Sequence, residues 1–231
     1  MTSTTSPLLV SVIIPTRNRA RLLEEIVRSL WTQSLPAESY EIIILDNCST
    51  DNTPQRMETL AAESPCRFTY RKLTENRGPA AARNLGATLA TGGVLAFTDS
   101  DCRAHPDWLA RAVNEFKAAP ELVLVSGPVV DKPEQPVKFF TLRNGAGPDE
   151  NYMYPACNVF YRRDVFLELG GFDESAYLYD IRASPIECTD TDFAWMVQEK
   201  GYGHRFLPDV IMYHEVARTS PLNWLLYHIR I

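Results

Sequence analysis

Two carboxylates stand two residues apart in the triplet Asp99-Ser100-Asp101, directly after the apolar run Val94–Thr98. Carboxylates this close repel each other unless a cation or hydrogen-bond donors compensate for their charge. Mg²⁺ and Mn²⁺ prefer oxygen ligands and are usually held by one or two carboxylates together with the phosphates of a substrate. The triplet therefore predicts a site for Mn²⁺ or Mg²⁺; the alternative is a solvated turn.

Two further polar segments follow apolar runs earlier in the chain. Pro15-Thr16-Arg17-Asn18 follows Val10–Ile14, and Asp46-Asn47 follows Ile42–Leu45. In an open parallel sheet, ligands bind outside the carboxyl ends of the strands, where all three polar segments would converge. Each segment alone could merely turn the chain or cap the next helix. Their convergence instead predicts a shared polar binding site.

Neither familiar glycine-rich phosphate cradle is present in the sequence. The connection after the first apolar run reads IIPTRNRARLL and contains no glycine, so it lacks the G-x-G-x-x-G of dinucleotide sites, and G-x-x-x-x-G-K-[ST] is also absent. A phosphate would therefore have to be held through a metal and scattered polar side chains.

The elements that must position these residues follow from the alternation of apolar runs with amphipathic stretches. The first half predicts strands at Val10–Ile14, Ile42–Leu45, Phe68–Lys72, Val94–Thr98 and Leu122–Ser126, with helices over 22–30, from about 54, after 79 and after 106. Such alternation predicts an α/β fold, a Rossmann-like, mostly parallel sheet flanked by helices.

The rhythm breaks after Gly127, where the segment 131–155 is rich in Pro, Gly, Asn and charge and is predicted to be a long functional loop. Apolar and amphipathic stretches return at 158–161, 165–169, 190–200 and 210–214, which indicates an α+β second half. We expect a single domain over 1–231, with its two halves at 1–127 and 128–220. Residues 221–231 carry leucines and an isoleucine at helical spacing, which predicts an amphipathic helix that could contact a membrane surface or a partner.

Composition narrows the class of protein further. The 231 residues carry a net charge of −6, which favours neither nucleic acid nor anionic lipid as a partner. The five cysteines are widely spaced without a C-x-x-C pair, which favours a reducing compartment. The N-terminus lacks the basic start of a signal peptide, and no run of 18 apolar residues could span a bilayer. We expect a cytoplasmic protein, in contact at most with the membrane periphery.

Six segments, in order along the chain, resemble the family 2 glycosyltransferases of the GT-A fold. VSVIIPTRNR is similar to the family's opening strand and nucleotide loop, LDNCSTDNT to its VDDGSTDxT segment, NRGPAAARNLG to NxGxxxARNxG, and FTDSDC to its DxD strand. TDTDFAW resembles the EDxDLxxR segment that carries the catalytic base, and PDVIMYHE resembles the closing strand with a metal-proximal histidine. The resemblance covers essentially residues 10–214, and it implies that 1–127 is the nucleotide-sugar half and 128–220 the acceptor half.

The resemblance implies a role for each matching residue. Asp190 would be the catalytic general base, and the metal would be held by Asp101, Asp99 and His214. The donor nucleotide would be bound by Pro15, Thr16, Arg17, Asp46, Asn47, Arg83, Asp99 and Ser100. This chain departs from the family in having Asp46-Asn47 for an acidic pair and Thr189-Asp190 for Glu-Asp. Which member of the first pair reads the base is therefore open.

The expected function is inverting transfer of one sugar from a nucleotide-diphosphate-sugar, with UDP as the expected nucleotide, to an acceptor hydroxyl. The acceptor is open among a glycan, a lipid-linked molecule, a peptide and a small metabolite. The QxxRW segment of processive synthases is missing, which favours transfer of a single sugar. The alternatives are a non-catalytic nucleotide- or sugar-binding module, in which Asp190 only caps a helix, and a sugar nucleotidyltransferase, which would be expected to open with a glycine-rich loop.

Overall fold

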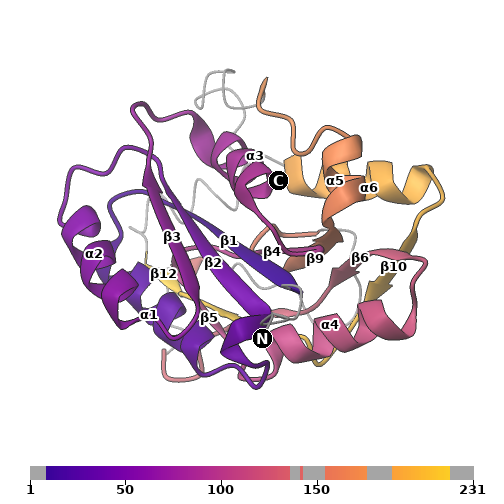
Figure 1. Ribbon diagram of the computed structural model, residues 1–231, viewed down its shortest axis with the longest axis horizontal. Helices are drawn as coiled ribbons and strands as arrows, with labels where there is room; N and C mark the ends of the chain where they lie inside the picture. Colours follow the sequence, from indigo (N-terminus) through magenta and orange to yellow (C-terminus); the bar gives the residue numbers. More distant parts are fainter. Residues whose placement is uncertain (1–8, 136–140, 143–153, 176–188, 219–231) are drawn as a thin grey trace, which may run out of the picture.

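A seven-stranded, mostly parallel sheet runs through the centre of the protein (Figure 1). The computed structural model describes residues 9–135, 141–142, 154–175 and 189–218. The strand order is β10-β6-β9-β4-β1-β2-β3, and β9 is antiparallel to both of its neighbours. The strands are β1 (Val10–Thr16), β2 (Tyr40–Asp46), β3 (Arg67–Lys72), β4 (Val94–Phe97), β6 (Leu122–Ser126), β9 (Val159–Arg162) and β10 (Gly203–Phe206).

Helices cover both faces of this sheet, with α1, α2 and α4 on one face and α3, α5 and α6 on the other (Figure 1). Alternate residues of β1 explain the two layers, because Val12 and Ile14 pack with the first group of helices while Ile13 packs with the second. The helices are α1 (Ala20–Trp31), α2 (Thr53–Glu63), α3 (Gly78–Leu89), α4 (Trp108–Ala118), α5 (Arg163–Glu168) and α6 (Thr189–Glu199), with a 3₁₀ turn η1 (Ala37–Ser39).

A second, three-stranded sheet has the order β5-β11-β7. It is built from β5 (Cys102–Ala104), β7 (Val129–Asp131) and β11 (Met212–His214). The strand expected over 210–214 is confirmed as β11, but the other two strands were not predicted because three residues are too few to show a period. A two-stranded pair, β8 (Thr141–Leu142) with β12 (Ala217–Arg218), completes the described strands.

The α/β fold class predicted from the sequence is confirmed, and each strand and helix expected in the first half is present. The segment 131–155 was expected to be one long loop. The structure differs, because β7 ends at the first residue of this segment and β8 lies within it. The helix expected over 221–231 lies outside the described residues. Within the described part of the chain, no helix is both long and apolar enough to cross a membrane.

Candidate functional site

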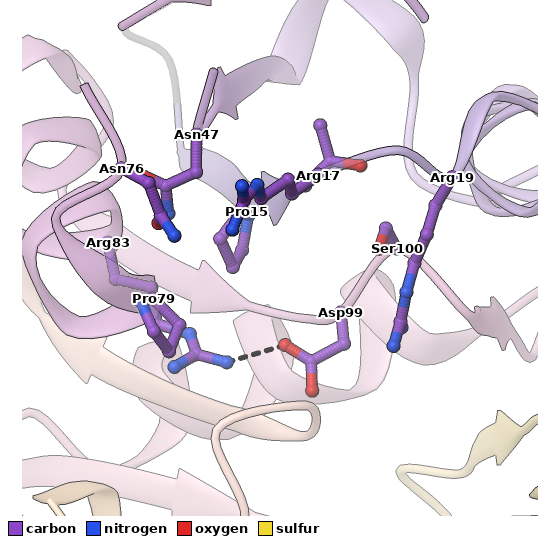
Figure 2. Close-up of a pocket in the computed structure, with 10 residues that line it drawn as sticks. Pro15, Arg17, Arg19, Asn47, Asn76, Pro79, Arg83, Asp99 and Ser100 are labelled. Atoms are coloured by element: carbon purple, nitrogen blue, oxygen red, sulfur yellow. Dashed lines mark hydrogen bonds and ion pairs between the residues drawn. The ribbon is translucent and has the colours of Figure 1, made fainter. Parts of the chain in front are cut away.

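A pocket of about 370 Å³ opens at the carboxyl ends of the central strands (Figure 2). Parallel register sets Thr16 beside Asp46 and Ile13 beside Phe97, so the polar residues that follow β1, β2 and β4 meet at one edge of the sheet. The lining residues are Pro15, Thr16, Arg17, Arg19, Asn47, Asn76, Pro79, Arg83, Asp99 and Ser100. Three of the ten are arginines, which suits a ligand with several negative charges.

Of the residues predicted to bind the donor, Asp46 is the one that does not line the pocket. Its carboxylate is fully buried, and both oxygens are occupied: Oδ1 accepts from the Ser49 backbone N–H at 2.8 Å and Oδ2 from the Tyr70 hydroxyl at 2.5 Å. Its neighbour Asn47 lines the pocket, with Nδ2 donating to the Gly78 carbonyl at 2.8 Å. The geometry places Asn47 at the pocket and Asp46 behind it.

The loops after β1 and β2 are tied together by Asn18. Its backbone N–H donates to Ser49 Oγ, and its side-chain Oδ1 accepts from the Thr50 N–H, each at 2.8 Å. Asn18 and Cys48 both have positive φ angles, 54° and 66°. Cys48 stands where the resembling VDDGSTDxT segment has glycine, and a left-handed backbone explains that preference. The two loops therefore form one wall of the pocket.

Arg83 and Asp99 face each other across the opposite wall, as Figure 2 shows. Arg83 Nη2 donates to Asp99 Oδ1 at 2.5 Å, and the arginine side chain is 10% exposed. Arg83 projects from α3, whose small residues Ala80 and Ala82 let the helix pack closely on the sheet. The Arg83 guanidinium is thus buried and held in place by its carboxylate partner.

Asp101, Cys102 and His214 form a group whose potential ligand atoms all lie within 4.8 Å of one another. The small sheet brings these three residues together, because antiparallel pairing of β11 with β5 places His214 beside Cys102. Asp101 Oδ1 lies 3.4 Å from His214 Nε2. Asp99, the third predicted ligand, is not in this group, since its carboxylate pairs with Arg83. Cys102 was not predicted, and nothing in the sequence but its position after Asp101 indicates it.

The donor set fits a divalent cation. His214 Nδ1 lies 2.8 Å from the Glu215 carbonyl oxygen, which can only accept, so Nδ1 carries the proton. The other ring nitrogen, Nε2, faces Oδ1 of Asp101, a buried carboxylate oxygen that has no hydrogen-bond partner. A divalent cation between these two atoms would have both as ligands. A carboxylate and an imidazole suit Mn²⁺ well, whereas the thiol of Cys102 would favour a softer metal.

Asp190 lies in the first turn of α6, close to Arg83 and Asp99. Oδ2 accepts from the Ala156 N–H at 2.6 Å and Oδ1 from the Thr191 N–H at 2.9 Å. Burial raises the pKa of the Asp190 carboxyl above its ordinary value, while the Ala156 N–H and the charge of Arg83 act in the opposite direction. The helix is held by Phe193, whose ring centroid is 4.8 Å from that of Phe166. Asp190 is thus a fixed, partly desolvated carboxyl group with neighbours at the pocket.

Four buried polar atoms at this edge of the sheet have no hydrogen-bond partner: Thr16 Oγ1, Asn47 Oδ1, Arg83 Nε and Asp101 Oδ1. Unsatisfied buried groups are costly and uncommon in folded proteins, so a cluster of them indicates a ligand site. Sequence reasoning gave no role to three lining residues, Arg19, Asn76 and Pro79. All three lie inside the segments VSVIIPTRNR and NRGPAAARNLG, so the motifs had pointed to their positions but not to their chemistry.

The chain is similar to known glycosyltransferases over most of its length. It is 29% identical to the glycosyltransferase AglE of Haloferax volcanii, over 93% of this chain and 68% of that protein. It is 27% identical to the pre-mycofactocin glycosyltransferase of Mycobacterium tuberculosis, over 94% of this chain and 44% of that protein. The chain therefore spans less than half of the second relative.

Solved structures show the same fold. A mannosyltransferase from Pyrobaculum calidifontis, in complex with GDP-Man and Mn²⁺, superposes with a TM-score of 0.74 at 24% identity, covering 98% of this chain and 63% of that one. TarS of S. aureus in complex with UDP gives a TM-score of 0.70 at 22% identity, covering 96% and 63%. The model of the family described as glycosyl transferase family 2 matches residues 11–170, and the chain belongs to that family.

Proposed function

We propose that this protein transfers one glycosyl group from a nucleotide-diphosphate-sugar to an acceptor hydroxyl, with inversion at the anomeric carbon. The observation that carries the proposal is the unpartnered, buried Asp101 Oδ1 facing His214 Nε2 beside a pocket lined by three arginines. Membership of glycosyl transferase family 2 supports the same reaction class. UDP is the proposed nucleotide; the solved neighbours hold UDP or GDP-Man, so both bases belong in the test.

Asp101 and His214 are the proposed ligands of a divalent metal, Mn²⁺ or Mg²⁺. When bound, such a cation neutralises negative charge that builds on a departing diphosphate. Arg83 adds a fixed positive charge from the protein, and Arg17 and Arg19 line the same pocket. Together these groups would favour departure of a nucleoside diphosphate from the sugar.

Asp190 is the proposed general base. Its two oxygens accept backbone N–H groups yet keep further lone pairs, so one oxygen can take the proton of an acceptor hydroxyl. As that proton moves to Asp190, the hydroxyl oxygen bonds to the anomeric carbon and the bond from this carbon to the diphosphate oxygen breaks. The raised pKa of Asp190 makes it a better proton acceptor than an ordinary aspartate.

The proposed location is the cytoplasm, with residues 221–231 as a contact to a membrane surface or a partner. The location is supported by the cysteines, since Cys48, Cys66, Cys102 and Cys157 all carry free thiols. The acceptor is proposed to be a glycan, a lipid-linked molecule, a peptide or a small metabolite whose hydroxyl approaches Asp190 beside the segment 154–157.

Nucleotide release from a panel of UDP-, GDP- and dTDP-sugars, with candidate acceptors, tests the proposal. Loss of a general base costs about 10²- to 10⁴-fold, so Asp190→Asn should reduce turnover by that order while donor affinity stays within a few-fold. Asp192→Asn is the matched control, because this exposed residue lies on the same helical turn. Equal turnover by wild type and Asp190→Asn would overturn the base assignment. Donor binding without turnover for any acceptor would instead favour a binding module.

A further inference from the structure

Arg19 connects the pocket to the proposed metal ligand. It lies at the N-cap of α1, lines the pocket, and its Nη1 forms an ion pair with Asp101 Oδ2. Its side chain is 47% exposed, whereas that of Asp101 is 14% exposed. A half-exposed arginine therefore pairs with the carboxylate that the proposed metal needs.

Asp101 presents its two oxygens to different partners. Oδ2 meets Arg19, and Oδ1 faces His214 without a hydrogen-bond partner. A divalent cation at Oδ1 would stand close to the Arg19 guanidinium, and like charges at such short range oppose each other. Metal binding should therefore weaken the ion pair between Arg19 and Asp101.

The second pocket arginine with a carboxylate partner is arranged differently. Arg83 is 10% exposed and is held on Asp99 within the wall of the pocket. The Arg19 side chain is less constrained than that of Arg83. Nearly half of it is exposed to solvent, and among the described residues it pairs with Asp101 alone. Arg19 can thus change partners, while Arg83 is fixed.

We propose that Arg19 is an exchangeable cation: it neutralises Asp101 in the metal-free site and moves onto the donor's diphosphate when metal and nucleotide bind. A guanidinium suits both positions, since it forms charge-assisted hydrogen bonds with carboxylates and with phosphates. This inference rests on the proposed function, and it assigns Arg19 a double role that neither a purely structural residue nor a simple phosphate ligand would have.

The double role predicts two effects of opposite sign in Arg19→Met. Without nucleotide, Mn²⁺ should bind about three- to tenfold more tightly, because its competitor for Asp101 is gone. With saturating Mn²⁺, the nucleotide that wild type binds, UDP or GDP, should bind about tenfold more weakly, because a charge-assisted contact to the diphosphate is lost. Free Mn²⁺ measured by electron paramagnetic resonance gives the first constant, and isothermal titration calorimetry gives the second.

Two further variants sharpen the test. Arg17→Met removes a neighbouring exposed arginine that lines the pocket without an ion pair to Asp101, so its affinity for Mn²⁺ should change less than twofold. Arg19→Lys keeps the charge, so its affinities for Mn²⁺ and for the nucleotide should lie between those of wild type and those of Arg19→Met. Unchanged Mn²⁺ affinity in Arg19→Met, or unchanged nucleotide affinity, would overturn the role inferred for Arg19 but not the proposed function. A wild type that binds neither Mn²⁺ nor nucleotide would contradict the proposed function itself.

Discussion

Asp190 shows how one residue's surroundings set its chemistry. Burial raises the pKa of Asp190, and the proposed general base acts in its deprotonated form. Activity should therefore fall as the pH drops through a value above the ordinary aspartate pKa of 3.8. Arg83 opposes the rise, so Arg83→Met should move the acidic limb of the kcat profile to higher pH. The measurement is kcat against pH for both proteins.

The control for this profile is Arg77→Met, which removes an exposed arginine that precedes the same helix, α3, and pairs with Glu174 outside the pocket. Its acidic limb should coincide with that of wild type. A limb that stays in place in Arg83→Met, or moves to lower pH, would show that Arg83 does not act on the base.

The pair Asp46-Asn47 marks the limit of sequence reasoning at this scale. The motif located both residues at the end of β2, and the structure agrees. Which one faces the pocket depends on Tyr70, a residue of the neighbouring strand β3 whose hydroxyl donates to the Asp46 carboxylate. Such a contact across strands leaves no periodic signal in the sequence. The same holds for Arg19, whose partner Asp101 is 82 residues away.

At the scale of elements, the junction of β6, β7 and β11 decides where His214 lies. Asn158 Nδ2 donates to the Pro128 and Val210 carbonyls, at 2.9 and 2.8 Å, and so ties the turn after β6 to the segment that leads into β11. Gly127 permits the approach, because a Cβ there would lie 2.0 Å from the Val210 carbonyl oxygen.

Gly127→Ala should therefore displace the Val210 segment and shift β11. We expect the free energy of unfolding to fall by about 3 kcal/mol, which is the upper part of the range for overpacking, and Tm to fall by roughly 6 to 12 °C. Mn²⁺ affinity should fall as well, since His214 follows on the displaced strand. Gly93→Ala is the control, because a Cβ at that position meets nothing within 4 Å. Equal melting curves for the two variants would refute this account of the junction.

The large sheet and the small one differ in how far the sequence predicts them. The inner strands β1, β2, β4 and β6 show as largely apolar runs, because helices bury both of their faces. The edge strand β10, whose sequence is GHRF, shows no such run and was not predicted. The three strands of the small sheet have three residues each, and their pairing depends on contacts such as that of Glu215 N–H with the Asp101 carbonyl at 3.0 Å. Sequence reasoning therefore placed the pocket at the right edge of the sheet but did not explain how His214 comes to lie beside Asp101.

For the molecule as a whole, local charge outweighs net charge. The chain carries −6 overall, yet three arginines line one pocket at the carboxyl edge of the sheet. We therefore expect an anionic ligand to be attracted by the site and not by the protein's overall field. Screening by salt should weaken its binding only modestly at the buried Arg83. The fold supplies this concentration of charge by bringing the loop after β1, which carries Arg17 and Arg19, to the same edge of the sheet as Arg83 of α3.

The central claim is that the pocket binds a nucleoside diphosphate together with a metal held by Asp101. The most direct test is the melting temperature of wild type with UDP or GDP, each with Mn²⁺ and with EDTA. At 100 times its Kd, the matching nucleotide should add about 2.7 kcal/mol, a rise of roughly 5 to 10 °C. We expect that rise only with Mn²⁺, its loss in Asp101→Asn, and its retention in the exposed control Asp209→Asn. Equal shifts with Mn²⁺ and EDTA, or the same shift in Asp101→Asn, would contradict the claim.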